Sequence, residues 1–383
     1  MKRNSKIGII GGYGFHNVGD DMQLYNNVKV LKTNGYKHLF VMSPDNYIAD
    51  LCNLPKIFPS FHSILKLKHR DNDEWILQKY ELLKQGSIDY PKNIKKLSSN
   101  MQKMLRFING LDVLFFSGSG TINTRSLYGL LVMLTPCLIA KNLGKKVILS
   151  GQGFLPFENP TLERIIAEIL NQCDKIFTRD FEIGKKALNR IGVNQSKVIL
   201  GIDDAFTTPP SKKLKLPEKT IAINVSRFIQ PNLYKVFYNL AKKLKKEGYN
   251  PIFNYFQDDR KVAEGCSQKE FSIYEFEHIA DIVDFYYKVT ASIGMRYHST
   301  ILGLAGGNPT INIYVTDYQK YKISAIQNAT GLTNFMINYK DCNATKLYNM
   351  IQKAIKYQPA ILKKINTNWR KKSNLAIDYL KKL

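Results

Sequence analysis

A short apolar run, a glycine-containing turn and a helical pattern follow one another repeatedly along this chain of 383 residues. This alternation predicts parallel strands joined by helices, and therefore a doubly wound α/β sheet. In the first half, strands are expected at Lys6–Gly11, His38–Ser43, Asp112–Ser117, Lys146–Gly151, Lys175–Arg179 and Lys197–Ile202. Helices are expected between several of them, at Asp20–Asn34, Thr124–Asn142, Pro160–Gln172 and Asp180–Ile191.

The alternation breaks at Thr208-Pro209-Pro210-Ser211, the best candidate for a linker, and then resumes. The later strands are expected at Thr220–Val225, Pro251–Tyr255, Val289–Ile293 and Thr310–Tyr314. The later helices are expected at Leu233–Gly248, Glu275–Lys288 and Tyr297–Gly306. We therefore predict an α/β protein of two Rossmann-like domains, 1–208 and 214–343, facing a central cleft lined by the loops that follow the strands.

Two segments lie outside this alternation. Residues 55–106 are rich in lysine, show weak periodicity and contain no clear strand, which favours a helical insertion in the first domain. The tail, 344–383, has a helical pattern with ten Lys and Arg against one acid, Asp378. One interpretation is a set of closing helices that expose lysines to water; the other is a basic amphipathic surface that binds the inner face of the membrane.

The formal net charge of +25 requires an explanation, and only 11 of the 56 basic residues are arginine. With no nucleic-acid-binding motif, this composition argues against a nucleic-acid partner. It fits either a soluble lysine-rich surface or attraction to anionic substrates and lipid head groups. No apolar run approaches the ~20 residues that span a bilayer, and Lys6–Gly11 forms a first strand rather than a signal peptide. We expect a cytoplasmic protein, peripheral to the membrane if the tail binds lipid. The five dispersed cysteines indicate reduced thiols.

The first expected strand runs into a glycine-rich loop that opens the first helix. Glycines there let backbone amides approach a ligand, and the helix N-terminus favours an anion. A dinucleotide fingerprint is poorly supported, because Asn17 occupies the place of its third glycine. Asn17 and Asp20 are each suited to cap the helix. Since one cap needs only one residue, the surplus of Asn17, Asp20 and Asp21 favours ligand binding.

Two further strands of the first half end in small polar residues. Gly118, Ser119 and Gly120 follow one of them, with Asn123 and Arg125 just beyond. Gln152 follows the other, between two glycines. Each loop alone is a weak signal, because glycine after a strand often serves only the turn. Three such loops on one edge of a sheet predict a polar wall for a hydroxyl-rich or phosphorylated ligand.

In the second half, two strands run into basic residues. Thr220–Val225 leads into Arg227, and Val289–Ile293 leads into Arg296, Tyr297 and His298. Arginine holds carboxylate or phosphate in a bidentate fork, so two of them suit a small ligand that bears both groups. His298 is a residue type that can move a proton near neutral pH. The alternatives are an ion pair between Arg296 and an aspartate, and a backbone-bonded His298 at the helix start.

The carboxylates of the chain do not predict a metal site. Asp71-Asn72-Asp73 has the spacing of metal-dependent sugar transferases but does not follow a strand. Asp203-Asp204 and Asp258-Asp259 have no histidine or further carboxylate nearby in the sequence. We therefore expect no obligatory metal and no cofactor.

Taken in order, these motifs resemble the polysaccharide pyruvyl transferase family, from Lys6 to about Leu332. The resemblance rests on Asn17-x-Gly19-Asp20, Gly118-Ser119-Gly120, Gly151-Gln152-Gly153, Thr178-Arg179-Asp180, the neighbourhood of Asp204 and Phe206, Ser226-Arg227 and Gly294-x-Arg296-x-His298. It implies a GT-B-like architecture and a ketal-forming transfer of pyruvate from phosphoenolpyruvate, as co-substrate, to a sugar of a surface polysaccharide or its lipid-linked precursor.

The resemblance also implies roles for individual residues. Donor binding falls on Arg227, Arg296 and His298, with Tyr297 between the last two, and His298 becomes the catalytic candidate. The acceptor falls on the loops of the first domain, where Asp20 or Asp21 is the candidate for the group that takes the hydroxyl proton. Two other functions stay open: a GT-B glycosyltransferase with a nucleotide-sugar donor, and a glycan- or head-group-binding protein without catalysis.

Overall fold

The computed structural model describes residues 2–54, 58–61, 63, 66, 73–154, 156–207, 214–256, 259–330 and 333–383. They form two compact units, Met1–Asp204 with Asn374–Leu383, and Ala205–Ser373. The division falls between Asp204 and Ala205, close to the expected linker, whose residues 208–213 lie outside the described part. The last ten residues belong to the first unit, so the basic tail is shared between the two units.

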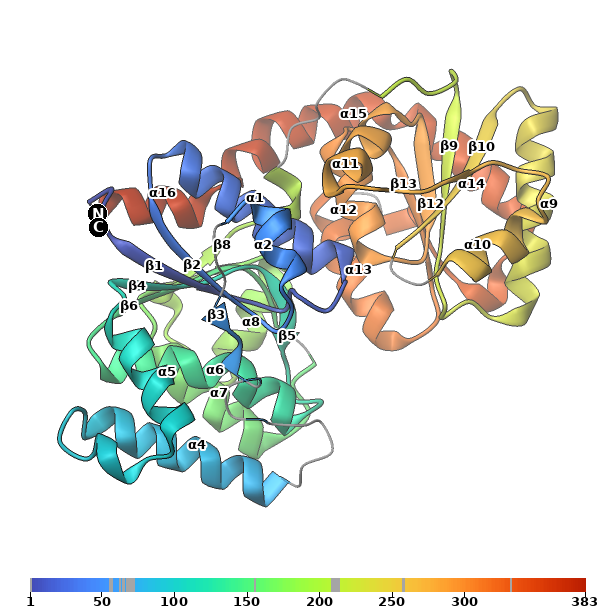
Figure 1. Cartoon of the computed structure of the whole chain (residues 1–383). Coiled ribbons are helices and arrows are strands. Elements are labelled where there is room, and N and C mark those ends of the chain that lie inside the picture. The colour runs from blue at the N-terminus through green and yellow to red at the C-terminus, as the bar shows by residue number, and fades with distance from the viewer. Residues whose placement is uncertain are drawn as a thin grey trace. The chain divides into compact units, whose positions relative to one another are not determined.

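The first unit is built on a parallel sheet with strand order β3-β2-β1-β4-β6-β7-β8, with the short β5 paired to β6 (Figure 1). Its strands are β1 (Lys6–Ile10), β2 (His38–Ser43), β3 (Phe58–Pro59), β4 (Val113–Phe116), β5 (Ser119–Ile122), β6 (Lys146–Phe154), β7 (Lys175–Thr178) and β8 (Val198–Leu200). Its helices are α1 (Val18–Thr33), α2 (Tyr47–Cys52), α4 (Asp73–Ile88), α5 (Ser99–Asn109), α6 (Leu127–Asn142), α7 (Pro160–Gln172), α8 (Phe181–Arg190) and α16 (Leu375–Lys382).

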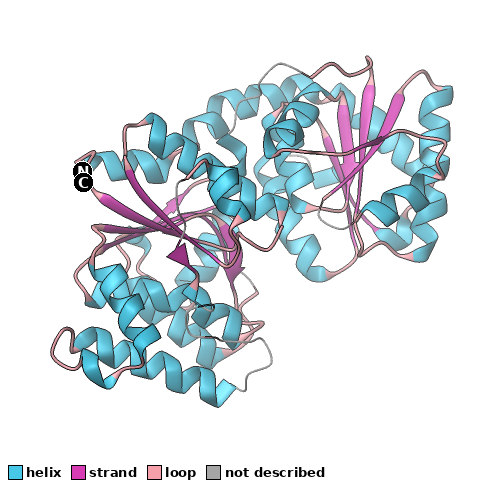
Figure 2. Ribbon diagram, viewed as in Figure 1, coloured by secondary structure: helices cyan, strands magenta, loops and turns pink. Residues whose placement is uncertain are grey.

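Helices cover both faces of this sheet (Figure 2). Strand β4 shows why: Val113 and Phe115 belong to the apolar cluster that includes α1, α2 and α16. Leu114 and Phe116 belong to the cluster on the opposite face, with α4 to α7. A strand buried on both faces reads as a continuous apolar run, as the sequence of β4 does.

The second unit carries a six-stranded parallel sheet in the order β11-β10-β9-β12-β13-β14. Its strands are β9 (Thr220–Val225), β10 (Asn250–Tyr255), β11 (Ile273–Tyr274), β12 (Ala291–Gly294), β13 (Thr310–Tyr314) and β14 (Met336–Asn338). Its helices are α9 (Pro231–Lys246), α10 (Arg260–Ser267), α11 (Ile279–Lys288), α12 (Tyr297–Ala305), α13 (Asp317–Thr330), α14 (Ala344–Lys356) and α15 (Gln358–Lys364). In chain order this sheet reads 3-2-1-4-5-6, the Rossmann arrangement. Two Rossmann-like sheets are thus confirmed.

The structure corrects the expected strands, and the short strands β3, β5, β11 and β14 were not expected. Ser119–Ile122 forms β5 rather than a loop, and β6 continues to Phe154 through the residues expected as a post-strand turn. β5 and β6 pair at Ser119 with Gln152 and at Ile122 with Phe154, with a shift of register between the two pairs. The pairing of β6 with β7 shifts between Leu149 and Gln152. Residues 55–106 contain the short strand β3, paired with β2, besides the expected helices.

Many apolar residues of the tail are buried, whereas Tyr357, Leu362 and Leu383 are exposed. In α14, Leu347, Ile351 and Ala354 are buried, while Lys346 and Lys353 are exposed. This burial is what closing helices predict. No helix among the described residues is both long and apolar enough to cross a bilayer.

Candidate functional site

The predicted site residues lie at the carboxyl ends of the central strands of each sheet. In the first unit the strand order reverses between β1 and β4, and in the second unit between β9 and β12. Ligands of doubly wound sheets bind outside the strands at such a switch point. Asn17 and Gly118 follow β1 and β4, while Arg227 and Arg296 follow β9 and β12.

The loop after β1 is fixed by the two aspartates of the first turn of α1. Asn17 is the residue before the helix, but its side chain makes no cap; Nδ2 donates to Asp20 Oδ2 at 2.6 Å. Asp21 accepts the Gly14 amide at 3.0 Å and the Tyr47 hydroxyl at 2.8 Å. Burial raises the pKa of Asp21 to about 6, although both hydrogen bonds lower it. Asp20 and Asp21 are 8% and 4% exposed, so much of their surface is already used within the loop.

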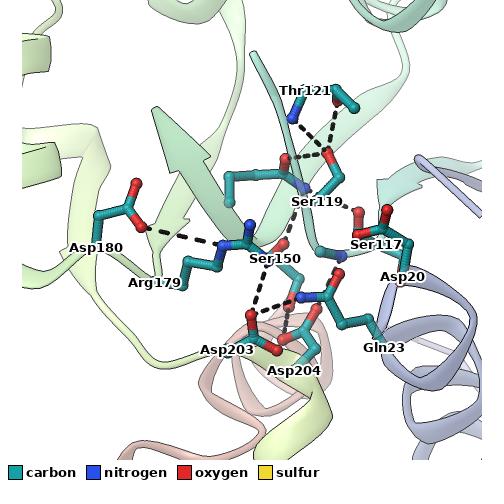
Figure 3. A network of polar contacts seen from close by, with 12 residues as sticks. Asp20, Gln23, Ser117, Ser119, Thr121, Ser150, Arg179, Asp180, Asp203 and Asp204 are labelled. Atoms are coloured by element: carbon teal, nitrogen blue, oxygen red, sulfur yellow. Dashed lines mark hydrogen bonds and ion pairs between the residues drawn. The ribbon is translucent and has the colours of Figure 1, made fainter. Parts of the chain in front are cut away.

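Asp204 accepts hydrogen bonds from three donors that lie far apart in the sequence; Figure 3 shows Asp204 beside one of them, Ser150. Asn27 Nδ2 of α1 and the Gly118 amide donate to Oδ2, at 2.7 Å and 3.0 Å. Ser150 Oγ of β6 donates to Oδ1 at 2.8 Å. Burial raises the pKa of Asp204 to about 6 against the effect of these bonds. Asp204 therefore joins α1, β4 and β6 where their ends meet.

The neighbouring Asp203 forms a buried ion pair. Its Oδ2 lies 2.7 Å from Arg179 Nη1 and accepts Gln23 Nε2 at 2.7 Å, with all three side chains inside the unit (Figure 3). Asp180 contacts the same arginine and accepts the Phe154 amide at 2.7 Å. Arg179 and Asp180 entered the sequence prediction through the family resemblance, and Asp203 only as a carboxylate set aside for a metal site. Here they hold the ends of β6, β7 and β8 together.

Several residues predicted to bind the acceptor lie within the sheet edge. Gln152 is fully buried, and its Nε2 donates to the carbonyls of Phe116, Ser117 and Ser150. Ser119 is also fully buried and donates to Gln152 Oε1 at 3.1 Å.

The remaining predicted acceptor residues lie closer to solvent. Gly120 and Asn123 are half-buried, and Arg125 is exposed. Asn123 orders this segment, because its Nδ2 donates to the Gly120 carbonyl and its Oδ1 accepts the Arg125 amide. Within the described segment, Arg125 carries the accessible charge beyond β5.

In the second unit, Asp259 connects both predicted arginines. It is fully buried; Oδ2 pairs with Arg296 Nη2 at 2.5 Å, and Oδ1 accepts the backbone amide of Arg227 at 2.9 Å. The Cζ atoms of both guanidinium groups lie over the ring of Phe228, at 5.5 Å for Arg227 and 5.3 Å for Arg296. The ion pair named as an alternative for Arg296 is present. Asp259, set aside in the sequence analysis, belongs to this cluster.

His298 lies in the first turn of α12, where the chain turns sharply out of β12. Its side chain is 8% exposed, and its ring meets that of Tyr297 edge to face at 5.0 Å. A side chain at Gly294 would place its Cβ 2.8 Å from Asn224 Cβ and 2.9 Å from Ser299 Oγ. Position 294 therefore requires glycine, and the close packing fixes the direction in which α12 begins.

Other chemistry is sparse in the described part of the chain. No three His, Cys, Asp or Glu side chains gather there in a way that would hold a metal ion. The five cysteines are free and buried. The residues 71–72 of the D-x-D pattern, and Asp258, lie outside the described residues.

Comparisons with known proteins agree on fold and family. The sequence model of a family described as polysaccharide pyruvyl transferase matches residues 17–318. No curated protein sequence matches the chain. Among solved structures, a candidate UDP-N-acetylglucosamine 2-epimerase from Listeria monocytogenes aligns with a TM-score of 0.64 at 11% identity, over 98% of this chain and 95% of that one.

Two further structures align over nearly their whole length. The UDP-GlcNAc 2-epimerase of Methanocaldococcus jannaschii gives a TM-score of 0.60 at 14% identity, covering 99% of this chain and 100% of that one. A glycosyltransferase from Rickettsia africae gives 0.60 at 12%, covering 100% and 98%. At these identities the likeness establishes the fold alone, and it confirms the GT-B-like class.

Proposed function

The chain belongs to the polysaccharide pyruvyl transferase family, and from that membership we propose that it transfers pyruvate from phosphoenolpyruvate to a sugar of a bacterial surface polysaccharide or its lipid-linked precursor. The product is a pyruvate ketal. The observation that carries the proposal is the arrangement around Asp259, which brings Arg227, Arg296 and, through α12, His298 to one edge of one sheet.

Phosphoenolpyruvate is a small molecule with a carboxylate and a phosphoryl group, and it suits two guanidinium groups stacked on one ring. Each arginine offers a planar fork of donors to an anionic oxygen pair. Arg227 is exposed and Arg296 is half-buried, so one is accessible and the other is held in place by Asp259. We propose that Arg296 orients the donor and that Arg227 closes on its second anionic group.

The proposed reaction needs one proton delivered and two hydroxyls captured. Protonation of the donor's methylene carbon, by His298 as general acid, produces an oxocarbenium-like centre at the carbon that bears the carboxylate. One sugar hydroxyl adds to that carbon, the bond from carbon to the phosphate oxygen breaks, and the second hydroxyl closes the ketal. Of the two hydroxyl protons, one restores the proton on His298 and the other leaves with the inorganic phosphate, so atoms and charge balance. The arginines stabilise the departing phosphate.

We propose that the acceptor binds at the carboxyl edge of the first sheet, in contact with Asn17, Gly120, Asn123 and Arg125. The burial of Gln152, Ser119 and Gly118 favours a supporting role for these three residues, through their bonds to β4, β6 and Asp204. Asp20 stays the candidate for the group that accepts a hydroxyl proton; its Oδ2 accepts Asn17 Nδ2, while Asp21 holds Gly14 and Tyr47.

The decisive experiment offers the protein phosphoenolpyruvate with a panel of lipid-linked and nucleotide-linked sugars, and follows phosphate release and product mass. We expect phosphate release that depends on the acceptor, and a product heavier by one pyruvate less one water. Transfer from a nucleotide sugar with none from phosphoenolpyruvate would establish the glycosyltransferase alternative. Binding of glycans without turnover of either donor would establish a binding protein.

A further inference from the structure

The donor cluster around Asp259 is short of positive charge for the ligand proposed above. A phosphate monoester carries nearly two negative charges near pH 7, and the carboxylate adds another. Of the two arginines, Arg296 is paired with the fully buried Asp259. Two guanidinium charges and the proton that His298 carries as general acid, less one carboxylate, leave a net charge of about +2 to face about −3. A further cation near His298 would reduce this difference.

Lys322 of α13 is placed to be that cation. Its Nζ lies 4.9 Å from the centre of the Tyr297 ring and 5.2 Å from that of Tyr318. The Tyr297 ring also meets the ring of His298 edge to face, at 5.0 Å between centroids. The Lys322 ammonium and the imidazole of the proposed general acid therefore contact the same aromatic ring.

Two features distinguish Lys322 from the many surface lysines. It is half-buried between rings of two helices, α12 and α13, rather than extended into solvent. Among the described residues, no carboxylate forms an ion pair with it. Aromatic faces attract an ammonium without neutralising it, so its full charge stays available to an anion.

The neighbouring Lys320 provides a comparison within the same helix. It lies two residues earlier, is exposed, and reaches the ring of Tyr314 at 5.7 Å rather than that of Tyr297. The two lysines thus have the same charge and the same kind of aromatic contact. They differ in burial and in the link through Tyr297 to His298.

We propose that Lys322 binds the phosphoryl group of the donor, as a third cation beside Arg227 and Arg296. This inference rests on the proposed function, because it assumes phosphoenolpyruvate as the ligand. The ammonium would act as a point charge on the dianionic end, while the arginines supply the planar forks. The tyrosine rings restrict the lysine side chain, which lowers the entropy lost on binding.

The test uses three variants of the full chain: Lys322→Met, Lys322→Arg and the matched control Lys320→Met. Methionine keeps an unbranched apolar stem between the two rings and removes the charge; arginine keeps both charge and stacking. For Lys322→Met we expect the KM for phosphoenolpyruvate to rise at least tenfold with a smaller change in kcat. Lys322→Arg should stay within about threefold of the wild type, and Lys320→Met within about twofold.

Inhibition by the two halves of the donor then locates the contact. In Lys322→Met, inhibition by the product inorganic phosphate should weaken at least fivefold, whereas inhibition by pyruvate, which mimics the carboxylate end of the donor, should not change. A thermal midpoint near that of the wild type shows that the fold is intact. Equal effects at positions 320 and 322, or weakened inhibition by pyruvate alone, would overturn the proposal while the wild type still transfers pyruvate. A wild type that neither binds nor turns over phosphoenolpyruvate refutes the proposed function itself, and the role of Lys322 with it.

Discussion

Replacing Asp204 by asparagine should stabilise the first unit near neutral pH. The hydrogen bonds of Asp204 are divided between its two oxygens: Asn27 and Gly118 donate to Oδ2, and Ser150 donates to Oδ1. An asparagine with its oxygen at the position of Oδ2 and its NH2 group at the position of Oδ1 keeps all three contacts. Asn27 and Gly118 then donate to that oxygen, and the Ser150 hydroxyl accepts from the NH2 group, because a hydroxyl can accept as well as donate. The substitution therefore removes the buried charge and little else.

The magnitude follows from the pKa of Asp204. Burial raises it from 3.8 to about 6, so between these values the folded chain binds a proton that the unfolded chain has released. Stability associated with this carboxyl is complete below pH 3.8 and is lost as the pH rises through 6. A shift of this size corresponds to about 3 kcal/mol. The Asp204→Asn variant should match the wild type near pH 4 and exceed it by about 3 kcal/mol at pH 7.5.

Urea unfolding followed by tryptophan fluorescence measures this difference. The chain has two tryptophans, Trp75 in α4 of the first unit and Trp369 in the second. In a Trp369→Phe background, the signal reports the first unit alone, which avoids treating two units as one transition. The refuting result is a free-energy difference that is independent of pH, or a variant less stable than the wild type at pH 7.5.

Asp174 is a control of opposite sign in the same unit. Burial opposes its ionisation, but hydrogen bonds from Lys141 and from the amide of Val147 outweigh burial and lower the pKa of Asp174. Its contribution is therefore present above the unfolded pKa and disappears as the pH falls through the folded one. Asp174→Asn should be less stable than the wild type at pH 7.5, and the loss should shrink towards low pH.

Three further predictions concern the donor cluster, a strand and the tail. Arg227→Ala should weaken donor binding about 10- to 100-fold, measured by calorimetric titration, and leave the thermal midpoint unchanged. Arg296→Ala should weaken binding as much and also lower the midpoint, because it leaves the buried Asp259 unpaired. Equal thermal midpoints for the two variants would contradict this difference. Gly151→Ala should destabilise the first unit by more than about 2 kcal/mol, since φ is +54° and a Cβ would lie 2.7 Å from the Asp204 carboxyl carbon. Urea unfolding that gives the variant the stability of the wild type would refute the expected backbone strain. If the tail binds membranes, replacing the exposed Lys346 and Lys353 by glutamate should abolish salt-sensitive flotation with anionic vesicles, whereas unchanged flotation would exclude α14 as the contact.

Much of the fold could be predicted because local and global preferences agree. The strands at His38–Ser43, Thr220–Val225 and Thr310–Tyr314 have the predicted bounds, since each is an apolar run buried in a parallel sheet. The helix Pro160–Gln172 also matches, because Asn159 caps it and proline occupies its first position. Strand β5 was missed because Ser119-Gly120-Thr121 has no apolar pattern of its own; its pairing with β6 is a tertiary effect.

The candidate site could be predicted only where the signal was local. Arg227 and Arg296 were found because each follows a clear strand. Asp259 was not, because 37 residues separate it from the arginine that it binds. Sheet order would have found it: β10, β9 and β12 are neighbours, and Asp259, Arg227 and Arg296 follow these three strands. The burial of Gln152 and Ser119 has no sequence signature at all, since polar residues near glycine look the same inside a strand and in a loop.

The last helix of the chain, α16, has a consequence for how the protein is made. Ala376, Ile377 and Leu380 complete an apolar cluster with Ile7 and Ile9 of the first strand. The ribosome therefore synthesises the whole of Ala205–Ser373 before it supplies the residues that finish the unit begun first. The second unit can fold while the nascent first unit still exposes to chaperones the part of its sheet that α16 will cover. Deletion of the final ten residues would accordingly destabilise the first unit, so a short truncation at the C-terminus would affect the fold of the N-terminal half.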